Sequence, residues 1–399
     1  MKSFLSISET ERRLLEYLGQ SLKSSGTAGE IFDLSNDEWE QIYSLADRHE
    51  VSVLMGVIFN SVNLSDKTQN DFELKTVRTV HKGITLQSLN VRLTALLSKA
   101  GITAVTLKGY AVARLYPIPE FRKTTDIDLF FFNSEDARKA EKILCENGFK
   151  HSKDWHANHH LVLISQKSET VELHTAWADE FKDKRLNNHL KSIEKASITH
   201  CVTIDCNGAR LYVYDTEYQA FYLIIHMLGH FVMGGFGLRN LCDWVVLWEN
   251  CDDENARDNF LKMVFNSGTE EFAKAVTSVC SQYLGLSAEK SPFPYNILTE
   301  KELTGEFLRD ILDAGEFGYS ESDRMVGMDG SSVLAYVKEF HHQMHINFPK
   351  AGRVTPLWPA LWIATLIRFL DNNRKFKRAS ISAIMKKAGD RGKLVKKLI

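Results

Sequence analysis

The chain has 399 residues, of which 44% are hydrophobic and 25% charged, and its formal net charge is −2 at pH 7. This length allows two or three domains, and the composition is typical of a folded globular protein rather than of a disordered chain. The small net charge excludes a general electrostatic attraction of the whole molecule to nucleic acid.

The sequence gives no sign of export or of a membrane span. Its first residues, MKSFLSISETERR, lack the long apolar segment of a secretory signal. The longest apolar stretch, residues 357–370, is too short to cross a bilayer and contains Pro359 and Arg368. The six cysteines form no C-x-x-C pair, so we interpret them as reduced thiols and expect a cytoplasmic protein.

The first quarter of the chain is expected to be helical. Apolar residues spaced three and four apart predict helices over residues 8–98, and Gly101 ends the last of them. A buried strand is predicted at 102–107, and Lys108-Gly109 then makes a tight exit into a short helix.

Two acids stand in the next predicted strand, DIDLFFF. Asp126 and Asp128 are two residues apart, so they share one face of the strand at a separation of roughly 7 Å. Glu172 lies in a second strand-like segment, TVELH, with apolar neighbours. Three carboxylates on one sheet face repel one another unless a cation lies between them, and Mg²⁺ is the usual choice for oxygen ligands.

A D-x-D pair alone is more often a solvated strand edge than a metal site. The order of elements around this pair favours the site. Between the acids, Ser134 is the expected N-cap of a helix and Gly148 its C′ residue. The predicted order is therefore strand, glycine turn, helix, Asp-x-Asp strand, helix, and a strand pair that carries the third acid.

This order resembles the nucleotidyltransferase superfamily that includes polymerase beta. It resembles in particular a bacterial, largely uncharacterised family with Leu-Lys-Gly, Arg-x-x-x-Asp-Ile-Asp and Glu-Leu-His motifs. These motifs stand here at 107–109, 122–128 and 172–174. The match covers about residues 100–180, with weaker similarity to about residue 245.

The resemblance implies a fold and an activity. The fold is α+β, a mixed sheet with flanking helices between an amino-terminal helical region and a larger carboxy-terminal one. The activity is transfer of a nucleoside monophosphate from an NTP such as ATP to a hydroxyl acceptor, with Mg²⁺ (or Mn²⁺) and release of pyrophosphate. The implied catalytic and metal-binding residues are Asp126, Asp128 and Glu172; those implied at the nucleotide phosphates are Lys108, Gly109, Arg122, Thr125 and His174.

The first motif departs from the superfamily pattern. There, the glycine is usually followed by Ser or Gly, whereas Gly109 is followed by Tyr110. Lys108 is the expected substitute, as a point charge on phosphate.

The carboxy-terminal half contains further candidates. His226 and His230 share a helix face, and we interpret them as core or interhelix histidines more readily than as metal ligands. Arg239 and Asp243, also four apart, are predicted either to form an intrahelical ion pair or, with His226, to orient the substrate. The histidine-rich stretch 155–160 is a weaker candidate for binding a transition metal.

Other signals organise this half of the chain. Asn-Gly at 207–208 between two β-rich segments predicts a hairpin. Helices are predicted from residue 217 onward, with a break at 234–237. The predicted domains are a helical region at 1–98, a nucleotidyltransferase-like core with the hairpin at 99–215, and a helical domain at 216–399.

The last residues are strongly basic. Residues 374–399 contain ten Lys or Arg and one acid, a local charge of +9, which leaves −11 for the rest of the chain. This asymmetry indicates an anionic partner, either RNA, a membrane surface or a phosphorylated substrate, or else a solvated tail that balances an acidic body.

Three functions remain open from the sequence. The acceptor is a small hydroxyl compound, or it is a macromolecule such as tRNA or protein, as for a toxin. The third alternative is an inactive nucleotide-binding module, which the Gly109-Tyr110 departure allows and the presence of all three acids opposes.

Overall fold

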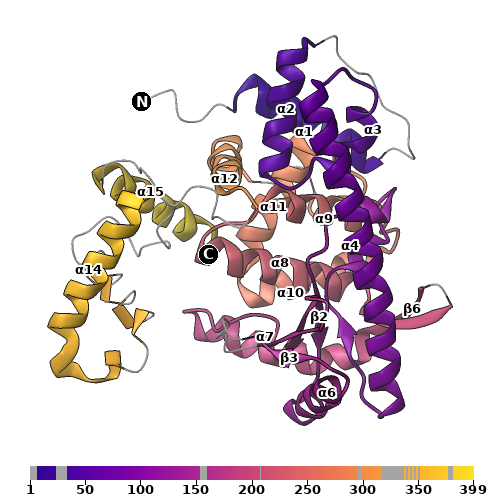
Figure 1. The fold of residues 1–399 in the computed structure, drawn as a ribbon, viewed down its shortest axis with the longest axis vertical. Coiled ribbons are helices and arrows are strands. Elements are labelled where there is room, and N and C mark those ends of the chain that lie inside the picture. The colour runs from indigo at the N-terminus through magenta and orange to yellow at the C-terminus, as the bar shows by residue number, and fades with distance from the viewer. Residues whose placement is uncertain are drawn as a thin grey trace.

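The structure is a computed structural model. It describes residues 7–23, 34–152, 160–206, 208–294, 299–316, 351–375 and 381–399, with single positions between 337 and 348. The described chain forms one mixed sheet with many flanking helices (Figure 1). This arrangement confirms the predicted α+β class.

The sheet has seven strands in the order β3-β4-β5-β2-β1-β7-β6. Two pairs, β2 with β5 and β1 with β7, are parallel, and the other neighbours are antiparallel. The strands are β1 Val105–Thr106, β2 Asp126–Phe130, β3 Lys150–His151, β4 His160–Ile164, β5 Thr170–His174, β6 Cys201–Cys206 and β7 Ala209–Tyr214. The predicted hairpin is therefore confirmed as β6 and β7, which pair antiparallel from Cys201 with Tyr214 to Cys206 with Ala209.

Helices fill most of the chain on either side of the sheet segment, as predicted. The described α-helices are α1 Glu9–Lys23, α2 Asn36–Arg48, α3 Gly56–Phe59, α4 Asp66–Lys99, α5 Tyr110–Ala113, α6 Ser134–Glu146, α7 Lys184–Ala196, α8 Thr216–Met233, α9 Leu238–Glu249, α10 Glu254–Ser267, α11 Glu270–Tyr283, α12 Lys301–Ala314, α14 Trp358–Lys375 and α15 Ile381–Leu398. The glycine-rich break at 234–237 separates α8 from α9 as expected.

The cap of α6 differs from the prediction. Asn133, rather than Ser134, is the N-cap, and its side chain accepts a hydrogen bond of 2.8 Å from the backbone N–H of Asp136. Asn is as good a cap as Ser, so the helix begins one residue earlier than its serine suggested. Gly148 follows the helix with a φ of +93°, which confirms it as the C′ residue.

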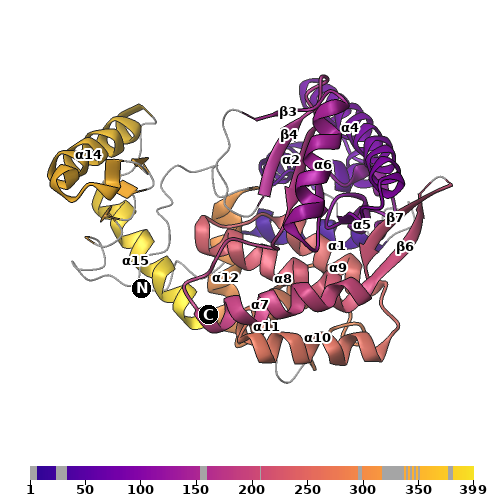
Figure 2. The ribbon, with the colours of Figure 1, turned by 90° about the horizontal axis from the view of Figure 1, so that it is seen from below.

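The two faces of β2 pack against different layers. Ile127, Leu129 and Phe131 face the apolar side of α4 and α6, while Phe130 belongs to the core on the side of α8. Figure 2 shows α4 and α6 on one side of the sheet and α8 on the other. Asp126 and Asp128 have the parity of Phe130, so strand alternation directs them toward α8.

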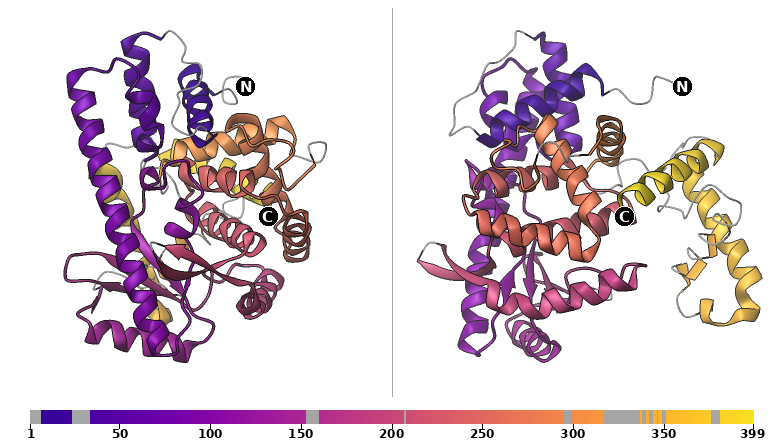
Figure 3. Two further views of the ribbon diagram at one scale, coloured as in Figure 1. Left: turned by 90° about the vertical axis from the view of Figure 1, so that its right-hand side faces the viewer. Right: turned by 180° about the vertical axis from the view of Figure 1, so that it is seen from behind.

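The amino-terminal and carboxy-terminal helices share one hydrophobic core. Leu18 of α1 and Trp244 of α9 are both fully buried in it. A Cβ atom on Gly19 would lie 2.8 Å from the carbonyl oxygen of Leu284, so α1 requires glycine at this approach. Figure 3 shows the indigo amino-terminal helices beside the orange α11 and α12. The predicted domain boundaries remain predictions.

Two further expectations concern the whole chain. All six cysteines are unpaired, in agreement with their interpretation as thiols. Within the described residues, no helix is both long and apolar enough to cross a membrane.

Candidate active site

The register between β2 and β5 assembles the acidic face. Asp128 lies opposite Glu172, whereas Asp126 lies opposite Thr170, one pleat repeat away. Because the strands are parallel neighbours, Asp128 and Glu172 project side by side from the same face. The sheet therefore brings the second and third predicted acids together and sets the first about 7 Å along the strand.

His174 completes the cluster. Candidate ligand atoms of Asp128, Glu172 and His174 all lie within 4.8 Å of one another, in a group that does not include Asp126. His174 Nε2 is 3.1 Å from Asp128 Oδ1 and 3.3 Å from Glu172 Oε2. The assembled group therefore contains His174 where the predicted triad had Asp126. The register explains this, because it aligns Asp126 with Thr170 rather than with Glu172.

Asp128 retains a free coordination position. Its side chain is 1% exposed, and its Oδ2 atom is buried without a hydrogen bond from any described residue. A buried carboxylate oxygen without a partner is costly, and a bound cation removes that cost. The two carboxylates supply the oxygen ligands that Mg²⁺ and Mn²⁺ prefer, so the residues present fit such an ion.

Lys108 provides a positive charge at the same carboxylate. Its Nζ atom lies 3.3 Å from Asp128 Oδ1. Burial alone lowers the pKa of Lys108, but the Asp128 carboxylate raises it above its usual value. Burial likewise raises the pKa of Asp128, but Lys108 and the hydrogen bond from His174 hold it well below its usual range. Both groups are therefore charged at neutral pH.

The other titratable groups respond to the same charges. Burial and then the neighbouring Asp128 raise the pKa of Asp126. Burial opposes ionisation of Glu172 too, but the hydrogen bond from His174 lowers its pKa overall. Burial lowers the pKa of His174, and its contacts with Asp128 and Glu172 outweigh that effect and raise it.

Strand β1 positions the Lys108-Gly109 turn. The backbone N–H of Leu107 donates to the Asp128 carbonyl at 3.1 Å, and Gln219 Nε2 donates to the Leu107 carbonyl at 2.8 Å. Gly109 has a φ of +60° and a ψ of −121°, a backbone conformation that L side chains rarely adopt. The glycine is needed for this turn, as the sequence motif indicated.

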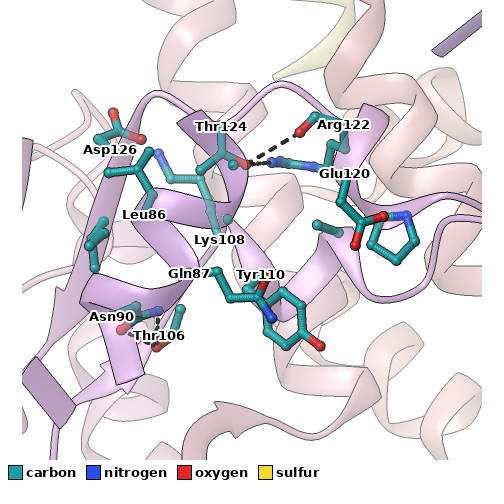
Figure 4. A pocket seen from close by; sticks show the side chains of 15 residues that line it. Leu86, Gln87, Asn90, Thr106, Lys108, Tyr110, Glu120, Arg122, Thr124 and Asp126 are labelled. Carbon is teal, nitrogen blue, oxygen red and sulfur yellow. Dashed lines mark hydrogen bonds between the residues drawn. The ribbon is translucent and has the colours of Figure 1, made fainter. Parts of the chain in front are cut away.

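A small cavity of about 30 Å³ lies beside the turn. Lys108, Gly109, Tyr110 and Asp126 line it, and Figure 4 shows Asp126 and Lys108 toward one side of it. Thr124 also lines the cavity, whereas the predicted Thr125 does not.

Arg122 is held by Asp243. Its Nε and Nη2 atoms donate to the two Asp243 oxygens at 2.7 and 2.6 Å, and the Tyr116 hydroxyl donates to the same carboxylate at 2.6 Å. Arg122 and Asp243 are both almost fully buried. Burial lowers the pKa of the guanidinium, but Asp243 raises it overall. The geometry therefore makes Arg122 an anchor between the loop before β2 and α9. It also lines the cavity beside Lys108, and its predicted contact with phosphate stays a prediction.

Arg239 also finds a partner outside its helix. Its Nη1 atom donates to the Lys123 carbonyl at 2.9 Å, and its Nη2 atom lies 3.4 Å from Glu316 Oε1. Lys123 Nζ is 2.9 Å from Glu316 Oε2. The Arg239–Lys123 and Arg122–Asp243 contacts thus form two links between α9 and the loop before β2, and the predicted intrahelical pairing of Arg239 with Asp243 stays a prediction.

Three side chains of α8 share the face toward the site. Tyr222, His226 and His230 are spaced four apart, and the two imidazole rings meet edge to face with centroids 4.5 Å apart. Burial, followed by the charge of Lys108, lowers the pKa of His226 well below its usual value and that of His230 to about 4. Both imidazoles are therefore neutral at pH 7.

Tyr222 is a site residue that the motifs missed. Burial raises its pKa, while Lys108 lowers it and the carboxylates of Asp128 and Glu172 raise it, which places the hydroxyl in the electrostatic field of the cluster. Its i, i+4 spacing from His226 is the sequence signal that could have found it.

Two other groups of possible ligands lie elsewhere. Most of the histidine-rich stretch 155–160 lies outside the described residues, so its predicted metal binding stays a prediction. Ligand atoms of His200, Asp215 and Glu217 form a second close group. Asp215 caps α8, and its Oδ2 is 2.7 Å from His200 Nδ1, so this group has a structural role at the start of that helix.

The model of a family described as uncharacterised nucleotidyltransferase matches residues 35–285, more than half of the chain. The chain belongs to this family, and its membership supports a general role in nucleotidyl transfer.

A solved structure offers a more distant likeness. The crystal structure of an antigenic nucleotidyltransferase-like protein from Paracoccidioides brasiliensis is 14% identical, with 51% of this chain and 93% of that chain covered and a TM-score of 0.31. A score this low carries no argument about the site. No curated protein matches the chain.

Proposed function

We propose that the protein transfers a nucleoside monophosphate from an NTP to a hydroxyl acceptor, with Mg²⁺ or Mn²⁺ held by Asp128 and Glu172. The observation that carries the proposal is the buried, unpartnered Oδ2 of Asp128 beside Glu172 in a chain of this family. When bound, the cation neutralises charge on the phosphates and lowers the pKa of the acceptor oxygen.

The carboxylates have distinct tasks in this proposal. Asp128 and Glu172 project side by side and supply the oxygen ligands. Asp126 lies one pleat further along, at the edge of the cavity beside Lys108, and serves the end of the site nearer the nucleotide phosphates. Imidazole is a poorer ligand for Mg²⁺ than oxygen, so His174 orients the two carboxylates through Nε2.

The turn after β1 meets the phosphates. Lys108 lines the cavity beside the turn and 19% of its side chain is exposed, so we expect an anionic substrate to reach its ammonium group although that group also contacts Asp128. Gly109 presents backbone without a side chain at the same place. Arg122 contributes by fixing the loop that leads into β2, through its buried pairing with Asp243.

The acceptor approaches from the side of α8. His226 and His230 are partly buried, neutral and directed toward the carboxylate cluster. A neutral imidazole accepts or donates a hydrogen bond without adding charge, which suits orientation of a hydroxyl group. Arg239 stands at the same edge and supplies a cation near Asp126.

Thermal stability measured with each of the four NTPs, with and without Mg²⁺, tests the proposal. We expect one NTP to raise the melting temperature of the wild type in a Mg²⁺-dependent manner. Asp128→Asn should abolish this shift, and the exposed Asp258→Asn on α10 should preserve it.

A transfer assay then distinguishes catalysis from binding. Asp128→Asn should lower the rate of pyrophosphate release by about 10²–10⁴-fold, through loss of charge stabilisation at the phosphates. Absence of any NTP-dependent shift in the wild type would instead favour an inactive module. An unchanged transfer rate in Asp128→Asn would refute the assignment of the site.

A further inference from the structure

Thr124 lies in the loop before β2, two residues ahead of Asp126. Its side chain lines the cavity beside the Lys108-Gly109 turn, and Figure 4 shows it on the same side of that cavity as Lys108 and Asp126. Its Cγ2 atom is 3.5 Å from the position that a Cβ atom on Gly109 would take. Thr124 therefore lies where we expect the nucleotide phosphates, although the sequence motif pointed to its neighbour, Thr125.

Arg122 holds the hydroxyl group of Thr124 from one side. Its Nη1 atom donates to Thr124 Oγ1 at 3.4 Å, a contact drawn in Figure 4. The guanidinium is itself fixed by its two hydrogen bonds to the buried Asp243 carboxylate. Because a guanidinium only donates, Arg122 occupies an acceptor position of the hydroxyl and leaves the Thr124 O–H to donate elsewhere.

The hydroxyl proton of Thr124 has a poor acceptor in the part of the chain that the structure describes. That acceptor is the Arg122 carbonyl oxygen at 3.5 Å, a distance at which a hydrogen bond is weak. A phosphate oxygen is a better acceptor because it is charged, and it would meet the ammonium group of Lys108 in the same cavity. The local donors thus suit an anion that only accepts hydrogen bonds.

The hydroxyl of Tyr110, directly after Gly109, is engaged elsewhere. It forms a hydrogen bond with the Cys206 thiol at the end of β6, and burial followed by that thiol raises the pKa of Tyr110. Gln87 Nε2 donates to the same sulfur at 3.1 Å. Figure 4 shows Tyr110 beside Gln87 and away from Asp126. Of the two hydroxyls near the turn, that of Thr124 is therefore the one placed to meet a phosphate.

We propose that Thr124 is a substrate-binding residue, whose hydroxyl donates a hydrogen bond to a phosphate oxygen of the NTP while Arg122 holds it in that orientation. This inference rests on the proposed function, because it adds a residue to the same site. Arg122 then contributes to binding through Thr124 as well as through the loop that it anchors.

Calorimetric titration with inorganic pyrophosphate in the presence of Mg²⁺ tests the proposal, since this probe carries phosphate oxygens without a base or an acceptor. We expect Thr124→Val to raise the Kd of pyrophosphate by about 10- to 100-fold, through loss of a hydrogen bond to a charged group. Thr124→Ser keeps the hydroxyl and should bind as the wild type does. The control is Thr203→Val, an exposed substitution on β6 that should leave the Kd unchanged.

Three results would overturn the proposal. The first is failure of the wild type to bind pyrophosphate with Mg²⁺. The second is wild-type affinity in Thr124→Val; a loss of binding in Thr125→Val instead would return the phosphate contact to the residue that the motif indicated. The third is an equal loss in Thr124→Ser and Thr124→Val, which would show that the side chain acts through its packing on Gly109.

The same variants separate this inference from the proposed function. A wild type that binds pyrophosphate through Thr124 but transfers no nucleotide would support the role of Thr124 and refute the transfer reaction. A wild type that transfers nucleotide at a rate and with a pyrophosphate affinity that Thr124→Val retains would refute the role of Thr124 alone. Valine has nearly the shape of threonine, and an unchanged melting temperature without ligand confirms that the variants fold.

Discussion

Lys108 Nζ lies 3.3 Å from Asp128 Oδ1, so the chain places one of its own cations at the carboxylate that is the best candidate metal ligand. His174 Nε2 contacts the same oxygen at 3.1 Å. These two groups offset the repulsion among the carboxylates when no metal ion is bound. If the site binds a divalent cation as proposed, the cation at Oδ2 would compete with Lys108 for the negative charge of Asp128, and the ammonium group would then be available to the phosphates of the nucleotide.

Replacing Lys108 with Met should expose this competition. The free energy of unfolding should fall by about 1–3 kcal/mol without Mg²⁺, because Asp128 loses a charged partner in a buried position. Saturating Mg²⁺ should then stabilise the variant more than it stabilises the wild type, as measured by thermal denaturation. Lys195→Met, an exposed substitution on α7, is the control. Equal Mg²⁺-induced shifts in the wild type and Lys108→Met would contradict the competition.

Gly109 offers a separate test of the phosphate turn. Gly109→Ala should destabilise the fold by about 1–3 kcal/mol, because alanine is strained at a φ of +60°. It should also reduce the stabilisation by NTP, since the new methyl group and the strained turn alter the backbone beside Lys108. Gly101→Ala is a matched control, with a φ of +73° and no atom within 4 Å of the added Cβ. An equal loss of the NTP shift in both variants would show that strain alone is responsible.

Much of the site was predictable from local patterns. The parity of Asp126 and Asp128, the positive φ of Gly109 and the hairpin at 207–208 follow from short-range rules that the structure obeys. These features depend on the chain within a few residues of each position, so sequence spacing was sufficient.

The pairing of distant side chains was not predictable. Asp128 faces Glu172 and Asp126 faces Thr170 because of the β2–β5 register, which no spacing in the sequence specifies. Arg122 pairs with Asp243 across 121 positions of the chain, whereas the local i, i+4 rule suggested Arg239. The partner of a buried charge is set by the packing of β2 against α9, which a single sequence does not reveal.

The Arg122–Asp243 pair should contribute to stability more than to nucleotide binding. Arg122→Lys and Asp243→Asn should each lower the free energy of unfolding by about 3–5 kcal/mol, since each leaves a buried charge without its bidentate partner. The double variant should cost less than the sum of the two, as measured by chemical denaturation. If Arg122→Lys kept full stability and selectively lost the NTP shift, Arg122 would contact the phosphates directly.

Glu194 should make the stability of the protein depend on pH. Burial raises its pKa from 4.5 to about 7, although the backbone N–H of Trp177 donates to its Oε1 at 2.7 Å. The folded state therefore holds this proton more tightly than the unfolded chain. The resulting stability is fully present below about pH 4.5 and is lost as the pH rises through 7.

Glu194→Gln should remove that dependence. The amide keeps an acceptor for the Trp177 N–H and has no charge to desolvate, so the variant should exceed the wild type in stability above pH 7 by up to about 3 kcal/mol. Below pH 4.5 the two proteins should be equally stable. Chemical denaturation across this range makes the comparison, with the exposed Glu289→Gln as the control that should follow the wild-type curve. A constant difference between Glu194→Gln and the wild type at every pH would show that the side chain acts through packing rather than through its proton.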